Sequence, residues 1–174
     1  MANFLKQRAA SLFSPRGKLR YALSLIEAGE VGRAFAPLSA AATAGIPEAQ
    51  FRVGRAYLDG AGVPVSREEG ARWIERAAEA GWVEAQVVLA TLHLFGLVSG
   101  GSGSAVFSPS LSQQDAKPDY ERAGHWASRA AEAGSPDGQA LLGYILTSGP
   151  VELRDLDTAD GWYARSAEAG CPQG

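Results

Sequence analysis

One five-residue segment recurs along the chain at nearly constant spacing. It reads Ala-Ala-Glu-Ala-Gly at 77–81 and 130–134, Ser-Ala-Glu-Ala-Gly at 166–170 and Ala-Ala-Thr-Ala-Gly at 41–45. The closing glycines lie at positions 45, 81, 134 and 170, at intervals of 36, 53 and 36 residues, and the middle interval equals 36 plus an insertion of 17. Self-similarity at a fixed period of this size is typical of a repeat array.

Other positions follow the same register, counted from the closing glycine of each unit. A tryptophan lies eight residues before three of these glycines, and an arginine lies five residues before them. A glutamine lies five residues after a closing glycine in three units, and a small residue lies nine residues after it. The positions are Trp73, Trp126 and Trp162; Arg76, Arg129 and Arg165; Gln50, Gln86 and Gln139; and Gly54, Ala90 and Gly143. So many agreements predict that each unit repeats one local structure.

The start and the end of a first helix are marked in the unit that follows Gly45. Pro47 suits the first helical position, because the N–H that proline lacks would have no partner there. Glu48 follows it, where a carboxylate meets the positive end of the helix dipole. Gly60 ends this helix, and the segment 60–64, Gly-Ala-Gly-Val-Pro, predicts a turn.

A second helix follows the turn. Ser66, with Glu69 three residues later, matches a capping box at its start. Gly81 stands where a left-handed residue ends a helix. Each unit is therefore predicted to be a pair of antiparallel helices.

The apolar residues of each helix indicate how the pairs pack. In the second unit the expected buried positions are Ala49, Val53, Ala56 and Tyr57 on the first helix, and Ala71, Ile74, Ala77 and Ala78 on the second. Abundant alanine predicts closely spaced helices, with the tryptophans as the main bulky fillers. One pair cannot bury all its apolar surface, so the units must stack. We predict an all-α fold, an α-solenoid.

These residues resemble the Sel1-like repeat, a relative of the tetratricopeptide repeat. The resemblance rests on Ala49, Val53-Gly54, Tyr57, the Gly-x-Gly-Val turn at 60–63, Ala71, Trp73 and the segment 77–81. Later units depart from the pattern at His93, which stands where tyrosine is usual, and at 150–153. The resemblance implies a superhelix of the tetratricopeptide type. It also implies an adaptor or scaffold, in a bacterium, that binds other proteins.

The register divides the chain into a basic N-terminal segment, residues 1–18, and a repeat array, residues 19–174. The expected units are 19–45, 46–81, 82–134 and 135–170, and residues 171–174 begin a further unit. The third unit holds a flexible insertion at about 98–117, rich in Gly and Ser. This insertion is either a tolerated surface loop or a recognition loop that orders on a partner.

The N-terminal residues 1–20 contain five basic residues and no acidic one. The remaining 154 residues hold 11 basic and 19 acidic groups, a net charge of -8. No continuous apolar run follows the basic start, so the segment is not a secretory signal. Two interpretations stay open: a solvated helix that caps the array, or a segment that contacts an anionic membrane or an acidic partner.

The residue types that carry catalysis do not converge in this sequence. His93 and His125 have no Cys or carboxylate at metal-ligand spacing, and we expect structural roles for both. Cys171 cannot form an internal disulfide because it is the only cysteine. No phosphate-binding loop or zinc motif occurs. We therefore predict no enzyme, no cofactor and no metal, and the acidic balance argues against nucleic acid.

A binding surface is predicted on the first helices of the units, opposite their buried stripes. The candidate partner-binding residues are Phe51, Arg52, Arg55, Val87, Thr91 and Tyr144. Stacked helices would align them on the concave face, and aromatic and arginine residues are frequent anchors in interfaces. The alternative is the covered inner wall of the superhelix.

We therefore expect a cytoplasmic, non-catalytic adaptor for a protein partner. Contact of residues 1–20 with the inner face of a membrane is an open possibility. The alternative function is a regulatory or targeting segment of a longer protein, enzymatic or membrane-associated, since the chain ends four residues into a fifth unit.

Overall fold

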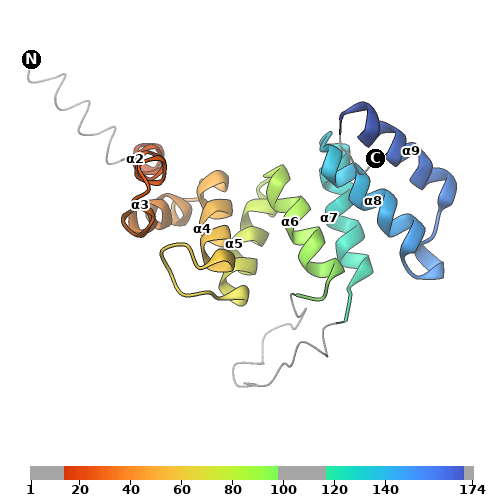
Figure 1. Ribbon diagram of the computed structural model, residues 1–174, viewed down its shortest axis with the longest axis horizontal. Helices are drawn as coiled ribbons and strands as arrows, with labels where there is room; N and C mark the ends of the chain where they lie inside the picture. Colours follow the sequence, from red (N-terminus) through yellow and green to blue (C-terminus); the bar gives the residue numbers. More distant parts are fainter. Residues whose placement is uncertain (1–13, 98–116, 171–174) are drawn as a thin grey trace, which may run out of the picture. The chain divides into compact units, whose positions relative to one another are not determined.

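The computed structural model describes residues 14–97 and 117–170, and these ranges contain helices and no strand (Figure 1). The α-helices are α2 (Pro15–Glu27), α3 (Val31–Thr43), α4 (Pro47–Asp59), α5 (Arg67–Glu79), α6 (Val83–Leu94), α7 (Tyr120–Glu132), α8 (Pro136–Ser148) and α9 (Leu156–Glu168). A short 3₁₀ helix, η1 (Val151–Leu153), lies between the last two. The all-α prediction is confirmed.

Consecutive helices pack in pairs, α2 with α3, α4 with α5, α6 with α7 and α8 with α9. The chain also divides into two larger compact parts, each holding two helix pairs. From here on the first unit means residues 1–82 and the second unit means residues 83–174. The first unit contains α2 to α5 and the second contains α6 to α9. The helix-pair architecture predicted from the register is therefore present in both units.

The helices begin and end where the sequence signals predicted. Pro47 and Pro136 occupy the first turns of α4 and α8. The Ser66 hydroxyl accepts a hydrogen bond from the Glu69 N–H at 3.3 Å, which satisfies one free donor of α5. Gly45, which follows α3, has a φ of 85°, and the other three closing glycines have the same left-handed backbone.

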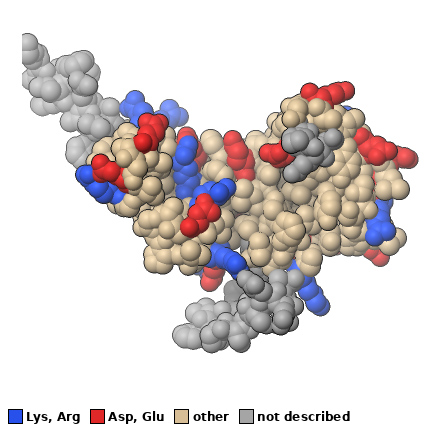
Figure 2. Space-filling model, in the orientation of Figure 1, with Lys and Arg blue, Asp and Glu red and all other residues tan. Residues whose placement is uncertain are grey.

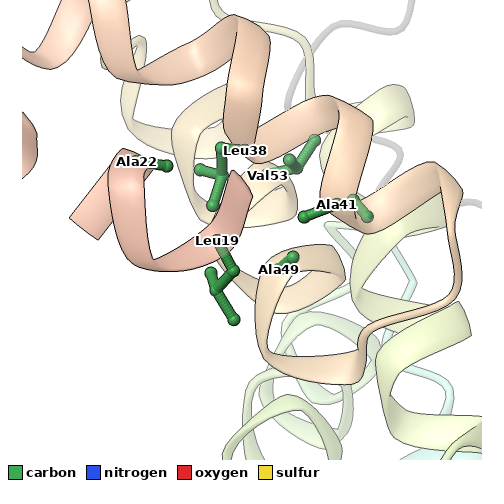
Figure 3. Close-up of a cluster of buried hydrophobic side chains, with 7 residues drawn as sticks. Leu19, Ala22, Leu38, Ala41, Ala49 and Val53 are labelled. Carbon is green, nitrogen blue, oxygen red and sulfur yellow. The ribbon is translucent and has the colours of Figure 1, made fainter. Parts of the chain in front are cut away.

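The core of the first unit joins three helices. Leu19 and Ala22 from α2 meet Leu38 and Ala41 from α3 and the apolar side of α4 (Figure 3). The ring of Phe35 packs edge-on against Tyr57 at 5.6 Å between centroids. Because most of the buried residues are small, the helix axes approach closely and the side chains interdigitate at high density.

The second unit repeats this arrangement with slightly larger side chains. Leu89 from α6, Ala127 from α7 and Ile145 from α8 are buried. Gly138 at the start of α8 lies so close to α7 that a Cβ there would be 2.6 Å from the Ala130 Cβ. The Ser166 hydroxyl of α9 donates to the Pro136 carbonyl oxygen at 2.8 Å and ties the last helix to α8.

The role predicted for the tryptophans is confirmed only in part, since Trp126 is buried and Trp73 packs against the core of the first unit. The largest fully buried side chains are Ile74, Leu89, Ile145, Val53 and Ser166. Trp73 and Trp162 are only half-buried, and an arginine guanidinium covers each repeat tryptophan. Trp126 is therefore part of the core of its helix pair, whereas Trp73 and Trp162 lie at its edge.

Several sequence predictions fall outside the described residues. These are the N-terminal segment up to residue 13, the insertion from 98 to 116, Cys171 and the further unit at 171–174. Helix α2 begins at Pro15, so the residues from Pro15 to Lys18 belong to a helix, and the Ser14 hydroxyl accepts from the Gly17 N–H at 3.0 Å. The repeat boundaries stay predictions.

Candidate functional site

The six predicted partner-binding residues lie on three first helices. Phe51, Arg52 and Arg55 are on α4 in the first unit, and Val87 and Thr91 on α6, with Tyr144 on α8, are in the second. None of the six is fully buried, and Tyr144 is 46% exposed. Two nearby residues of the same helices, Leu94 on α6 and Ala140 on α8, are buried.

The two arginines of α4 are each engaged with an acidic residue one turn away. Nη2 of Arg52 lies 3.0 Å from a Glu48 carboxylate oxygen, and Nη2 of Arg55 lies 3.1 Å from one of Asp59. Exposed pairs of this kind stabilise a helix by only about 0.3–0.5 kcal/mol. A carboxylate of a partner protein can therefore compete for either guanidinium at small cost.

Phe51 links α4 to the residue that precedes α6. Its ring lies 6.4 Å from the ring of Trp82, centroid to centroid, with a tilt of 35°. Both rings are half-buried. Aromatic pairs at this separation attract each other beyond simple burial, so Phe51 helps to fix the position of Trp82.

Trp82 forms one wall of a cavity in the first unit. The cavity has a volume of about 540 Å³ and is lined by Arg16, Leu19 and Arg20 of α2, by Ile46, Pro47 and Glu48 at the start of α4, and by Trp82. Of the lining residues, Glu48 forms an ion pair with Arg52, and the Trp82 ring contacts the Phe51 ring. Two of the predicted residues therefore contact lining residues of the cavity, although neither of them lines it.

The sequence prediction missed this cavity, although two signals pointed to it. Ile46 and Trp82 each follow a closing glycine directly, so they hold the same repeat position, and both are large and apolar. Arg16 and Arg20 belong to the basic N-terminal residues and lie four apart, which places them on one side of a helix. Only the tertiary structure shows that these two signals meet.

The charge around the cavity is opposite in sign to the net charge of the whole chain, which is -3. Two arginines line it, and the only carboxylate in its wall, Glu48, is paired with Arg52. Arg16 has no ion-pair partner among residues 14–97 and 117–170. Figure 2 shows Lys and Arg side chains, with acidic ones among them, over the part of the chain that carries α2 and α3.

The two histidines differ in environment. His93 is buried at the end of α6, and burial lowers the pKa of its imidazole, opposed by the nearby Asp119 carboxylate and reinforced by the Arg122 guanidinium. Its Nδ1 has no hydrogen-bond partner within the described part of the chain. His125 is exposed, and its ring lies 5.1 Å from that of Trp126.

The described ranges contain no group of three His, Cys, Asp or Glu residues placed to hold a metal ion. Among the helices that the structure describes, none has the length and apolarity needed to span a bilayer. Among the described residues, the concave feature of the first unit is a cavity with mainly apolar walls and two arginines in its lining.

Comparison with known proteins supports the repeat interpretation. The model of the Sel1 repeat matches residues 47–82, 111–135 and 136–171, which together are more than half of the chain. A search of curated protein sequences gave no significant match.

Two solved structures share the fold. One is a Sel1 repeat protein from Oxalobacter formigenes, 27% identical, with a TM-score of 0.74, and the alignment covers 92% of this chain and 60% of that one. The other is c5321, a protective antigen of uropathogenic Escherichia coli with an SLR fold, 22% identical, with a TM-score of 0.76 and coverage of 94% and 32%. This chain therefore spans less than two thirds of either relative.

Proposed function

Because the chain belongs to the Sel1 repeat family, we propose that it is a non-catalytic adaptor that binds a partner protein through the first helices of its repeats. Repeats of this fold generally serve protein–protein interaction. The proposed contact residues are Phe51, Arg52 and Arg55 in the first unit, and Val87, Thr91 and Tyr144 in the second.

One observation supports the proposal: an aromatic residue and an arginine of α4 each contact a residue that lines an apolar cavity. Phe51 contacts Trp82 in the cavity wall, and Arg52 pairs with Glu48 at its rim. Tyrosine, tryptophan and arginine contribute most of the binding energy in many interfaces, especially beside pockets. The exposed ring of Tyr144 supplies a similar anchor in the second unit.

The test is affinity purification of the full chain from its native host, followed by crosslinking and mass spectrometry. The double variant Arg52→Glu/Arg55→Glu should lose the partner, because it reverses two charges on α4. The matched control is Arg67→Glu/Arg72→Glu, which reverses two exposed charges on α5. Circular dichroism checks that both variants stay folded. Equal partner recovery with both variants would remove α4 from the binding surface.

A cytoplasmic location belongs to the same proposal, and peripheral membrane contact through residues 1–20 is a second candidate. The observation that favours membrane contact is five basic residues with no acidic one in this segment. Flotation with vesicles of anionic lipid tests it, comparing the whole chain with a variant in which the five basic residues of this segment are changed to glutamine. Binding that does not fall with salt, or that is unchanged in the variant, argues against this contact.

A further inference from the structure

The cavity of the first unit has apolar walls and room for a side chain. Leu19, Ile46, Pro47 and Trp82 contribute its hydrophobic surface, and its volume of about 540 Å³ lies within the usual range for ligand sites. These residues come from α2, from the start of α4 and from the residue before α6, so the site exists only when repeats stack. The cavity is open to solvent on one side, so an apolar group that enters it is partly removed from water, which favours binding.

The rim adds a charge preference. Arg16 and Arg20 lie one helical turn apart on α2, and both line the cavity. The opposing carboxylate of Glu48 is already engaged by Arg52 at 3.0 Å. A ligand with carboxylates therefore meets an excess of positive charge at this point of an acidic chain.

Trp82 is a wall that can adjust to a ligand. Its Nε1–H is buried and has no acceptor among the residues that the structure describes. A shift of the indole therefore breaks no protein hydrogen bond of this donor. Contact with the Phe51 ring limits the shift, because the two rings lie 6.4 Å apart.

We propose that this cavity binds an acidic peptide segment of the partner protein, with one large apolar side chain inside and flanking carboxylates at Arg16 and Arg20. The inference rests on the proposed adaptor function and adds the chemistry of the partner. Charge complementarity selects the peptide: a basic or neutral segment gains nothing from the two arginines, and a purely acidic one leaves the apolar walls unused.

The experiment measures fluorescence anisotropy of labelled peptides with the full chain. The probe is acetyl-Glu-Glu-Leu-Glu-Glu amide, and two control peptides carry Gln in place of every Glu or Ser in place of Leu. We expect each control peptide to bind about tenfold more weakly, because one lacks the charges and the other lacks the apolar group. Affinity for the probe should also fall as salt rises.

Three variants of the chain test the geometry. Arg16→Glu should weaken probe binding about tenfold, and Glu48→Gln should strengthen it a few-fold, since the rim becomes more positive. Arg67→Glu is the matched control, since Arg16 and Arg67 are both exposed arginines in the first turn of a helix, where glutamate is tolerated. It should leave binding unchanged.

Several outcomes overturn the inference. The probe does not bind, or the Ser peptide binds equally well, or Arg16→Glu and Arg67→Glu have equal effects, which would indicate net charge alone. Loss of anionic vesicle binding in Arg16→Glu without any peptide binding would assign the arginines to a membrane surface. If the native partner depends on Arg52 and Arg55 but not on Arg16, this inference fails and the adaptor function stands. If binding of the native partner depends neither on Arg52 and Arg55 nor on Arg16, both the proposed function and this inference are contradicted.

Discussion

Gly54 and Ile74 are in such close contact that a Cβ on Gly54 would lie 2.7 Å from the Ile74 Cγ1 and 2.9 Å from the Gly70 carbonyl oxygen. The close approach of Gly54 and Gly70 holds in both directions, because a Cβ on Gly70 would lie 3.0 Å from the Gly54 carbonyl oxygen. Helices α4 and α5 therefore cross backbone to backbone at this pair of glycines. The small residue nine positions after the closing glycine is a packing requirement here.

The first prediction concerns the crossing of α4 and α5. Gly54→Ala should lower the free energy of unfolding by about 1–3 kcal/mol, because the added methyl group overpacks a contact that includes backbone atoms. Urea denaturation followed by circular dichroism measures the change. Gly32→Ala is the control, because Gly32 lies in α3 with nothing within 4 Å of a Cβ. It should stabilise the chain by about 0.5–1 kcal/mol. Equal effects would contradict the crossing geometry.

The second prediction concerns the arginine that covers each repeat tryptophan. The Arg76 guanidinium lies 4.7 Å from the Trp73 ring centroid, and the corresponding distances for Arg129 on Trp126 and Arg165 on Trp162 are 4.9 and 4.7 Å. Arg76→Gln should cost about 0.5–1 kcal/mol of stability, since the cation over the ring is lost.

The matched control for this stacking is Arg67→Gln on the same helix, α5. Within the described residues, Arg67 does not contact an aromatic ring. Thermal unfolding should place Arg76→Gln below both the original chain and the Arg67 variant. In the Trp73→Phe background the effect of Arg76→Gln should shrink. A full effect in that background would show that the ring is not the partner.

The third prediction is an acid-dependent loss of stability. Burial lowers the pKa of His93 below 6.5, so the folded chain favours the neutral imidazole and the unfolded chain binds the proton first. The contribution of the neutral His93 imidazole to the free energy of unfolding is therefore fully present above pH 6.5. It is lost as the pH falls from 6.5 toward the pKa of His93 in the folded chain. The slope is at most about 1.4 kcal/mol per pH unit.

Urea midpoints between pH 7.5 and 5 measure this slope. His93→Gln should flatten it, whatever its effect at pH 7.5, because no titratable group remains at the buried position. His125→Gln is the control and should keep the slope, since His125 is exposed. A slope that is unchanged in His93→Gln would assign the acid sensitivity to carboxylates instead.

The repeat register was sufficient to predict the helices because each boundary depends on residues close in sequence. Gly45 and Gly81 take the left-handed backbone that ends a helix, and Ser66 caps α5, as the local pattern indicated. The same kind of signal at Ser14 and Pro15, which begin α2, was overlooked because the basic composition of that region suggested a separate segment.

The cavity could not be predicted because it depends on three stretches that are far apart in sequence. Arg16 on α2 and Trp82 before α6 are 66 residues apart, and only helix packing brings them to one site. The stacked arginines were also missed: Trp73 and Arg76 were seen in register, but the contact depends on side-chain direction. Periodicity gives the face of a helix, whereas a contact also needs the rotamer.

The last prediction joins the cavity to the proposed surface of α4. Phe51→Ala should weaken the acidic leucine peptide several-fold, because Trp82 loses the ring that holds it in the cavity wall. Phe51→Leu keeps an apolar contact and should retain most of the affinity. Arg72→Ala is the second control: Arg72 pairs with Glu68 and Glu69 on α5 and does not line the cavity, so peptide affinity should not change. Acrylamide quenching should show a more accessible tryptophan in Phe51→Ala alone. If Arg72→Ala reduces peptide affinity as much as Phe51→Ala does, the loss does not report on the cavity wall.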